Sequence, residues 1–429
     1  MTVEMETTIS GWDNYAVIQV VVLMGILSTV SYGACRVMDW LWKRRGVFSE
    51  LHQALKFTPY GTYTNMFEYW FIHVPFALKA PFCQRQVLED QIQKQLTTLF
   101  QLPPPESSSR PAFLLSHSCR TLFYCIIQTL LDQAQAKTGR RRIRIATVAV
   151  HFGSFYKLIK SMNQAGDEIE FYEIDLDPVD WTVKHDQIQE AQIAQCHVIF
   201  HQNLFGVPLQ QDKLLDLGRK LNLLIVEDCV QSGSMYGKYK GDPRSDVVMW
   251  SGGFDKTPSC LGAGIGHYRP TPYGDAMFDS CQSMMSSFAL DQHRMSTMFN
   301  QLLHLGIAKN SFSVVLYLGG LVVAYLLKRE DLQLHDMAFC VRTNKSVTPF
   351  QSAKDKFCHQ PSNWQLLSMI YGIGKQRHYE HIAREEVEKR VLLLQKVPSQ
   401  YHATIWPWLT PENLDLHQSN LGVSEFTWI

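Results

Sequence analysis

The sequence predicts an α/β fold in which a mostly parallel central sheet is covered by helices. Apolar, strand-like runs alternate with helical stretches over residues 112–266, the pattern of a parallel sheet with helices on both faces. Two runs, Leu223 to Val226 and Val247 to Trp250, are apolar throughout, as strands buried on both faces are. Polar residues follow both runs, at the strand ends where open α/β sheets place their ligands.

The elements of this sheet can be placed in order along the chain. A helix is expected at 87–101, where apolar residues recur at helical spacing, and a Pro- and Ser-rich loop follows it. A strand at 112–115 and a turn at 116–119 then lead into a helix at 122–131. The further predicted strands are 143–150, 170–175 and 198–206, and an amphipathic helix at 212–221 precedes the two apolar runs.

The composition limits the classes of function. The 429-residue chain is long enough for two or three domains, or for one large α/β domain with a smaller appendage, and its 46% hydrophobic content excludes a disordered chain. Forty basic residues balance forty acidic ones, so we expect no nucleic-acid partner. The ten cysteines include no CxxC pair, so no metal site is predicted, and they suit a reducing compartment.

An uncharged apolar segment lies near the N-terminus. Asn14 to Cys35 would span about 33 Å as a helix, which is enough to cross a bilayer. No basic residue precedes it, whereas Arg36 and the run Lys43-Arg44-Arg45 follow it. The positive-inside rule then predicts a single-pass N-terminal anchor within residues 1–36 and places the domain that follows it on the cytosolic side. The alternative is a buried core helix.

Two further segments bear on the membrane. Residues 37–86 form an aromatic-rich juxtamembrane segment, expected either at the cytosolic leaflet or packed against the domain that follows it. Asn310 to Leu327 is uncharged over its whole length but marginal for a span. It is expected to dip into the membrane, lie on it or pack beside the anchor.

The stretch from Leu223 to Gly266 carries the residues most relevant to chemistry. Asp228 follows one buried strand, Ser251 ends the next, and Lys256 comes five positions later. A carboxylate and a lysine at neighbouring strand ends indicate a functional site. The alternative is a surface lysine and an aspartate that caps a helix.

Glu227-Asp228-Cys229-Val230-Gln231, Ser251 and Lys256 together resemble the signature of the DegT/DnrJ/EryC1/StrS sugar aminotransferases. That family belongs to fold type I of the pyridoxal 5'-phosphate (PLP)-dependent enzymes. The resemblance implies PLP as cofactor, with Lys256 as the catalytic residue that carries it. It also implies Asp228 at the pyridine nitrogen, Gln231 at the phenolic oxygen and Ser251 at the phosphate.

Other family positions are altered in this chain. Ser118 and Cys119 stand where the family has an S-G-T turn that binds the phosphate at a helix N-terminus, and a plain helix cap is the alternative. Phe155 aligns with an aromatic residue that stacks on the pyridine ring, and a core phenylalanine is equally expected. Asn203 replaces the histidine of the family's H-L-Y-G turn, where a cofactor or substrate contact is implied.

The resemblance resumes at Pro361 and continues to Arg390. Just before it, Cys358 and Gln360 stand where the family has an N-x-R pair whose asparagine reaches a neighbouring subunit. That inter-subunit contact is therefore missing or replaced, although a homodimer is still expected by analogy. The predicted parts are an anchor (1–36), a juxtamembrane segment (37–86), a PLP-binding domain (87–270), an insertion (271–350) and a C-terminal domain (351–429).

The implied function is a membrane-anchored PLP-dependent aminotransferase. Glutamate or glutamine would donate the amino group, and the acceptor would be a keto group of a nucleotide-linked or lipid-linked sugar. Two alternatives stay open: a membrane-anchored enzyme similar to α-oxoamine synthases, and a non-catalytic membrane scaffold that has kept the fold.

Overall fold

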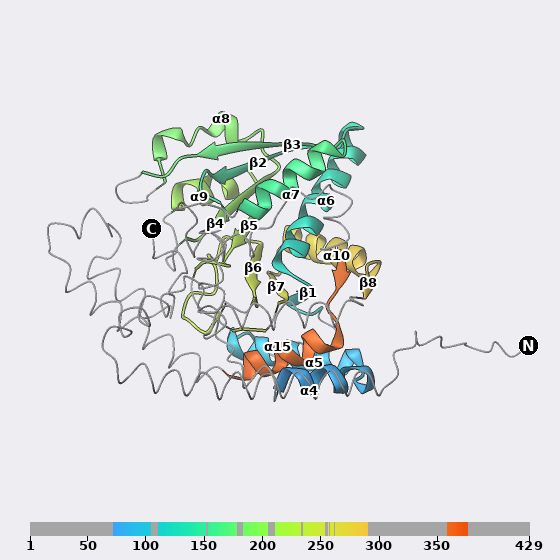
Figure 1. The fold of residues 1–429 in the computed structure, drawn as a ribbon. Helices are drawn as coiled ribbons and strands as arrows, with labels where there is room; N and C mark the ends of the chain where they lie inside the picture. The colour runs from blue at the N-terminus through green and yellow to red at the C-terminus, as the bar shows by residue number, and fades with distance from the viewer. Residues whose placement is uncertain are drawn as a thin grey trace, which may run out of the picture. The chain divides into compact units, whose positions relative to one another are not determined.

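The computed structural model describes residues 72–103, 110–151, 153–177, 183–204, 211–232, 235–253, 256, 258–260, 262–290 and 358–375 (Figure 1). All of them belong to one of two compact units of the chain, which comprises Pro59–Gln301 and Thr343–Ile429. The predicted anchor and the apolar stretch 310–327 lie outside the described residues. Within the described part, no helix has the length and apolar content needed to cross a membrane.

A seven-stranded sheet in the order β1-β7-β6-β5-β4-β2-β3 forms the centre of this unit. Only β7 runs antiparallel to its neighbours in this sheet, so the predicted mostly parallel sheet is confirmed. The carboxyl ends of the six parallel strands therefore meet at one edge. The strands are β1 (Phe113–Ser116), β2 (Arg142–Val148), β3 (Glu168–Ile174), β4 (Val198–Gln202), β5 (Leu224–Asp228), β6 (Val247–Ser251) and β7 (Gly264–Tyr268).

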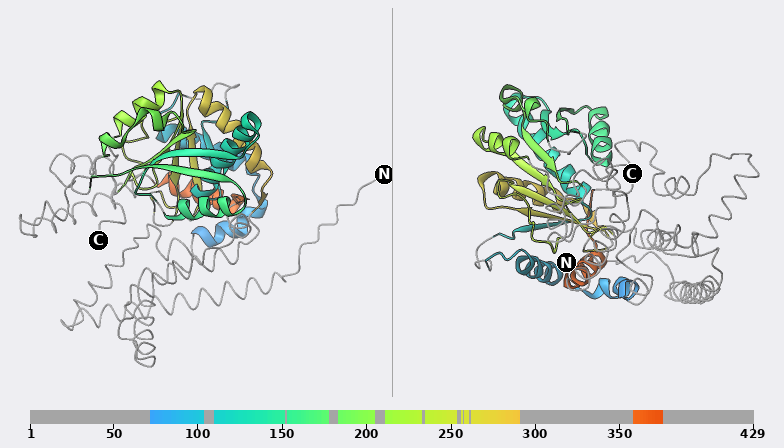
Figure 2. Two further views of the ribbon diagram at one scale, coloured as in Figure 1. Left: turned by 90° about the horizontal axis from the view of Figure 1, so that it is seen from above. Right: turned by 90° about the vertical axis from the view of Figure 1, so that its left-hand side faces the viewer.

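Helices cover both faces of the sheet (Figures 1 and 2). One face packs on α6 (Cys119–Thr138), α7 (Gly153–Gln164) and α10 (Pro272–Ser286), and this is the larger core. The other face packs on α8 (Glu190–Ile193) and α9 (Asp212–Lys220), with the short helix η3 (His185–Gln187) just before α8. Helices on both sides explain why the strands read as continuous apolar runs.

Side-chain alternation along β5 divides its residues between the two cores. Leu224 and Val226 belong to the core under α6, whereas Ile225 belongs to the core under α9. Because successive strand residues point to opposite faces, Asp228 lies on the α6 side and Glu227 on the α9 side. The two adjacent acidic side chains therefore lie on opposite faces of the sheet.

A second group of helices joins two distant parts of the chain, at the bottom of Figure 1. It comprises α4 (Val74–Lys79), η2 (Ala80–Phe82), α5 (Arg85–Leu99) and α15 (Asn363–Gly374), and α15 contacts the other three. The Trp364 indole N–H donates to the His73 carbonyl at 2.7 Å, and Arg85 donates to the Pro361 carbonyl at 2.8 Å. The described end of the aromatic-rich segment thus packs against α15 and the residues just before it.

The layered domain continues past residue 270, where the sequence places its boundary. Met277 and Phe278 of α10 are buried in the core under α6, and Phe278 meets the Tyr268 ring edge-on at 5.5 Å. After α10, the short strands β8 (Ala289–Leu290) and β9 (His359–Gln360) pair in parallel. The first part of the predicted insertion therefore belongs to the sheet's helical cover.

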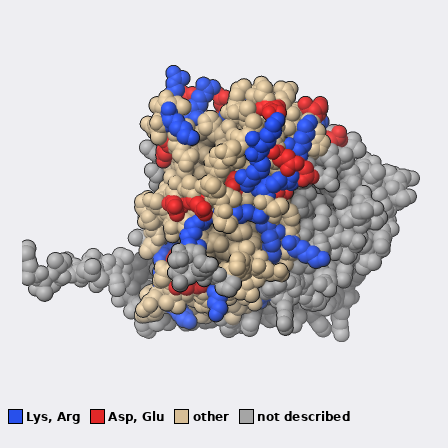
Figure 3. Space-filling view, turned by 180° about the vertical axis from the view of Figure 1, so that it is seen from behind, with Lys and Arg blue, Asp and Glu red and all other residues tan. Residues whose placement is uncertain are grey.

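Charged side chains form small mixed groups on the face shown in Figure 3. The basic run that begins at Arg140 leads into β2, and two of its arginines are paired: Arg141 binds Asp167 at 2.7 Å, and Arg142 binds Glu170 at 2.7 Å. Such pairs cancel much of the local field.

Candidate active site

Asp228 ends β5 at the carboxyl edge of the sheet and is only 4% exposed. Its Oδ1 atom accepts a hydrogen bond from the Val230 backbone N–H at 2.9 Å. Burial raises the pKa of this carboxyl to about 7, and Glu227 adds to the rise, while the Val230 hydrogen bond and the Lys256 charge oppose it. A buried carboxyl with a raised pKa gains most from a positively charged partner.

Lys256 lies in the loop that follows β6 and is half-buried. Its backbone N–H donates to the Gly253 carbonyl at 3.0 Å, and the Gly252 carbonyl accepts from two residues further along, which closes the loop. The charge of Lys256 lowers the pKa of both Asp228 and Cys119. These three groups, which come from three different parts of the chain, therefore lie within electrostatic range of one another.

The N-terminus of α6 borders this site. Ser118 is the N-cap, and its Oγ accepts from the Thr121 N–H at 3.3 Å, as the helix-cap alternative expects. Cys119 is buried, and its thiol pKa is raised well above the ordinary value, first by burial and then by Asp228. The first N–H groups of a helix this long favour an anion such as a phosphate.

A glycine on the facing strand lets β7 approach the turn before α6 closely. A Cβ atom on Gly264 of β7 would lie 2.5 Å from the Cys119 nitrogen and 2.5 Å from the Ser118 carbonyl carbon. The backbones of β7 and the α6 turn can approach this closely only because residue 264 has no side chain. Gly264 is visible in the sequence just after the Lys256 loop. Its contact with the Ser118–Cys119 turn could not be predicted from the sequence.

Ser251 and Gln231 lie at the expected edge. Ser251 is the last residue of β6, is half-buried, and its Oγ accepts from the Gly253 N–H at 3.3 Å. Gln231 is half-buried in the turn that follows β5, three residues after Asp228. Ser251 thus directly precedes the Lys256 loop, and Gln231 follows the neighbouring strand.

Phe155 lies in the core, as expected if it is a core phenylalanine and not a residue that stacks on a pyridine ring. It is 3% exposed, and its ring lies 4.3 Å from that of Phe123 with an interplanar angle of 20°. The stack on Phe123 already covers one face of the ring. An aromatic residue that the sequence did not assign, His151, comes soon after β2, is half-buried and stacks on Phe200 at 4.8 Å.

Asn203 does not face Asp228. Its Nδ2 donates to Glu227 Oε1 at 2.6 Å, on the α9 side of the sheet. The physical reason is strand alternation: Gln202 is the residue that pairs in register with Asp228 and shares its face. Gln202 is buried and donates to the Val148 carbonyl at 3.2 Å and to that of Val150, which holds the turn carrying His151.

The C-terminal segment reaches the same edge through α15. A capping box of Ser362 and Gln365 begins this helix, and Gln365 Oε1 lies 3.2 Å from His117 Nδ1 in the turn before α6. Gln360 donates to the Ser286 and Phe288 carbonyls at 3.0 and 2.9 Å. At the position of the family's N-x-R pair, this side chain therefore makes contacts within its own chain.

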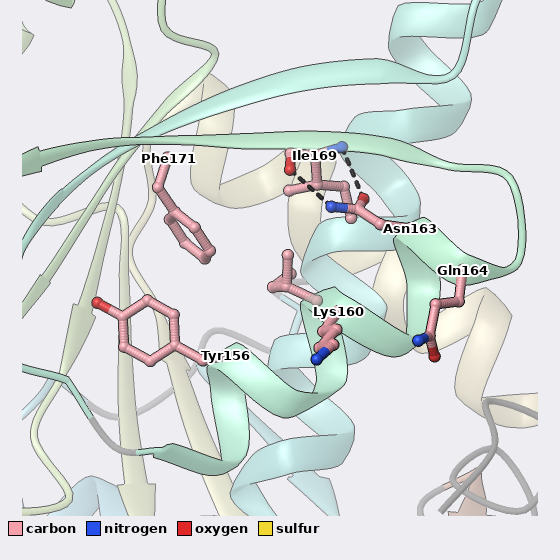
Figure 4. Close-up of a pocket in the computed structure, with 7 residues that line it drawn as sticks. Tyr156, Lys160, Asn163, Gln164, Ile169 and Phe171 are labelled. Atoms are coloured by element: carbon pink, nitrogen blue, oxygen red, sulfur yellow. Dashed lines mark hydrogen bonds between the residues drawn. The ribbon is translucent and has the colours of Figure 1, made fainter. Parts of the chain in front are cut away.

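A separate hollow of about 390 Å³ lies between α7 and β3 (Figure 4). The amide of Asn163 bridges the backbone N–H and carbonyl of Ile169, while Tyr156 and Phe171 line the wider end. None of the predicted site residues lines it. Among the described residues there is also no group of His, Cys, Asp or Glu that could hold a metal ion.

Comparison with solved structures supports the fold. A mutant of GDP-4-keto-6-deoxymannose-3-dehydratase (ColD) with bound GDP-perosamine matches 86% of this chain and 77% of its own, with 14% identity and a TM-score of 0.50. Spr1654 from Streptococcus pneumoniae, described as a sugar aminotransferase in its PMP-form, matches 74% of this chain and 68% of its own, with 11% identity and a TM-score of 0.42. A cysteine desulfurase from Thermococcus onnurineus matches 80% and 72%, with 13% identity and a TM-score of 0.43.

No protein-family model and no curated protein sequence matches the chain. At these identities, the solved structures bear on the fold alone. The α/β fold with its mostly parallel sheet is similar to that of the GDP-4-keto-6-deoxymannose-3-dehydratase structure.

The residues at this edge fit PLP as a ligand. Asp228 is a buried acceptor whose raised pKa suits a protonated ring nitrogen, and its carboxyl has a single hydrogen bond within the described part of the chain. Lys256 supplies the amine, and the first turn of α6 supplies N–H donors for a phosphate. The donor set thus matches each polar end of the cofactor.

Proposed function

We propose that this chain is a PLP-dependent aminotransferase. The observation that carries the proposal is the buried Asp228 at the carboxyl edge of the sheet, whose pKa the charge of Lys256 lowers, with the N-terminus of α6 in the same electrostatic surroundings. When bound, PLP supplies an electron sink that allows an amino group to be exchanged for a keto group. The fold alone supports a transferase of this class.

Each residue has a part that follows from its surroundings. The Asp228 carboxylate would accept the pyridine N–H and hold the proton on that nitrogen, which lowers its own pKa from the raised value. The Lys256 amine would bind the cofactor's aldehyde carbon. Once displaced by the amino donor, it would move the proton between the donor's Cα and C4′ of the cofactor.

The remaining groups would fix the cofactor's position. The first turn of α6 with Ser118, together with Ser251 at the end of β6, would bind the phosphate. Gln231 would reach the phenolic oxygen. His151, rather than core-packed Phe155, would lie against the ring and exclude water from that face.

The proposed acceptor is a keto group on a nucleotide-linked or lipid-linked sugar, with glutamate or glutamine as donor. The likeness in fold to ColD, whose structure contains GDP-perosamine, supports a nucleotide-linked sugar. Spr1654, described as a sugar aminotransferase, has a lower TM-score and adds nothing to this choice.

We also propose that the enzyme is held at the membrane by Asn14 to Cys35, with the catalytic unit on the cytosolic side. The absence of charge over this segment and the basic residues after it support the proposal. Full-length protein should sediment with membranes after carbonate washing, and deletion of residues 1–36 should release most of it. Full-length protein extracted by carbonate would contradict the anchor.

A homodimer is proposed because a C2 pair would direct both anchors to one membrane. Light scattering of detergent-solubilised protein would measure the mass of the protein component. A single copy at all concentrations would contradict the dimer.

Covalent attachment of the cofactor tests the enzyme proposal directly. Detergent-solubilised full-length protein is incubated with PLP, reduced with borohydride and digested, and the peptides are analysed by mass spectrometry. The cofactor mass should appear on the peptide that contains Lys256 and vanish in Lys256→Ala. The exposed Lys238, in the connection before β6, provides the matched control, and Lys238→Ala should keep the adduct. No adduct on wild-type Lys256 would overturn the proposal.

Turnover then separates an aminotransferase from the alternatives. Loaded protein mixed with glutamate should release 2-oxoglutarate in a single half-reaction without any second substrate. Release of carbon dioxide from an amino acid and an acyl thioester would instead indicate an α-oxoamine synthase. Attachment of PLP with neither reaction would favour a scaffold that retains the cofactor.

A further inference from the structure

Glu227 is a completely buried carboxylate, and its hydrogen bonds tie a long connection to the end of β5. The connection leaves β5 at Asp228 and returns at β6, which begins with Val247. The two carboxylate oxygens of Glu227 accept hydrogen bonds from several groups. Asn203 Nδ2 (2.6 Å), Cys229 Sγ (3.3 Å) and the Tyr239 hydroxyl donate to Oε1, while the Asp242 N–H (2.7 Å) and Ser245 Oγ (2.9 Å) donate to Oε2.

The backbone of the connection comes unusually close to this carboxylate. Gly241 has φ +95°, and a Cβ there would lie 2.6 Å from Val248 Cγ2 and 3.1 Å from Glu227 Oε2. His201 Nε2 lies 3.9 Å from Glu227 Oε2 and 3.1 Å from Ser245 Oγ. Burial lowers the pKa of His201, although Glu227 opposes this shift.

A carboxylate suits this arrangement, whereas an amide does not. Asn203 Nδ2 and the Asp242 N–H can donate but not accept, and they approach different oxygens of Glu227. A glutamine at 227 would have to turn its NH₂ group toward one of these two donors, which leaves buried donors facing each other. The same geometry accounts for Asn203, whose amide donates here without titrating.

We propose that Glu227 is a positioning residue for Asp228. Glu227 accepts hydrogen bonds from the beginning and from the later part of the connection between β5 and β6, and these bonds fix the end of β5. The Asp228 carboxyl projects from this strand end on the opposite face of the sheet, toward the pyridine nitrogen of the cofactor. The inference rests on the proposed function for the identity of that cofactor. The fixing of the strand end itself stands on the contacts of Glu227 alone.

A matched pair of isosteric variants tests the inference. Asp246 is also completely buried, and it accepts from the Ile225 N–H at 2.9 Å, at the other end of the same two strands. Glu227→Gln and Asp246→Asn therefore make the same chemical change at equal burial, but only the first lies beside Asp228. Ser245→Ala, which removes one neutral donor, serves as a milder second variant should Glu227→Gln not fold.

Two readouts are measured on full-length protein. Hydrogen exchange followed by mass spectrometry reports on segment 228–232, where the Val230 N–H donates to Asp228. Glu227→Gln should speed exchange there by about tenfold, and Ser245→Ala by about threefold, because local opening becomes easier. In cofactor-loaded protein, the midpoint of the pH titration of the visible absorbance should move in Glu227→Gln and not in Asp246→Asn.

The inference is overturned if segment 228–232 exchanges at the wild-type rate in Glu227→Gln, or speeds up equally in Asp246→Asn. An unmoved titration midpoint in loaded Glu227→Gln would also overturn it. If wild-type protein attaches no PLP at Lys256, the proposed function fails instead. The exchange data then still decide whether Glu227 fixes the strand end.

Discussion

Gly264 of β7 lies so close to Cys119 at the start of α6 that a Cβ at position 264 would stand 2.5 Å from the Cys119 nitrogen. This contact sets where the first N–H groups of α6 lie relative to the Lys256 loop. The chain thus keeps a glycine at the proposed phosphate end of the site, on the strand that faces the turn.

Gly264→Ala should therefore push the α6 turn away from β7. We expect a loss of about 1–3 kcal/mol in the free energy of unfolding, and PLP affinity at least several-fold weaker. Gly266→Ala on the same strand is the control, because a Cβ there first meets the Tyr268 side chain, at 2.7 Å. Urea unfolding and PLP titration measure both quantities. Equal PLP affinity in the two variants would argue against a phosphate at this turn.

Asp228→Asn should change how stability depends on pH in the cofactor-free protein. The folded-state pKa of about 7 exceeds the ordinary value of 3.8, so the folded protein binds the extra proton in this window and loses stability as pH rises through it. Asparagine does not titrate. From about pH 4 to about pH 8, wild type should lose up to about 4 kcal/mol relative to Asp228→Asn.

Urea unfolding at both pH values measures this difference, which must be absent at the acidic end. With PLP bound the order should reverse, because the protonated pyridine nitrogen favours the charged carboxyl. A pH-independent difference between the two proteins would contradict the buried, raised-pKa state of Asp228.

Phe155 and His151 should respond to substitution in opposite ways. Phe155→Leu removes the stack on Phe123 and should cost about 1–3 kcal/mol of stability, with PLP affinity nearly unchanged. His151→Ala, at a half-buried ring, should cost less stability but weaken PLP binding several-fold. Thermal unfolding and PLP titration of both variants separate the two roles. Weaker PLP binding in Phe155→Leu alone would return the ring contact to Phe155.

Gln365 should matter more than a helix cap alone. Ser362→Ala removes the cap of α15 and should cost about 1 kcal/mol. Gln365→Ala removes its part of the capping box and also the contact with His117, so its cost should be roughly twice as large. Chemical denaturation of both variants makes the comparison. Equal costs would mean that the contact between α15 and the α6 turn contributes no stability.

Much of the sheet could be read from the sequence because strands buried on both faces must be apolar throughout. The runs that contain Val226 and Val248 are of this kind, and both became central strands. The same reasoning predicts that Asp228, Ser251 and Lys256 lie at one edge of the sheet, because parallel strands bring their carboxyl ends to one edge. The site's charged pair was therefore available from spacing and strand direction.

Side-chain direction was decided only by the tertiary structure. The sequence could not say that Asn203 falls in register to face Glu227 while Gln202 shares the face of Asp228, since a shift of one residue reverses every side chain. Nor could it say that Phe155 packs on Phe123, because a ring stacked in the core and a ring beside a ligand have the same local pattern.

By itself, the sequence determined the mostly parallel α/β sheet and pointed to Asp228 and Lys256 as the residues of the proposed site, because apolar periodicity and strand ends are local properties of the chain. Only the tertiary structure decided that Gly264 of β7 packs against the α6 turn. It also decided that the side chains of Glu227 and Asp228 lie on opposite faces of the sheet. Those features depend on contacts between residues far apart in the chain, and no local pattern records them.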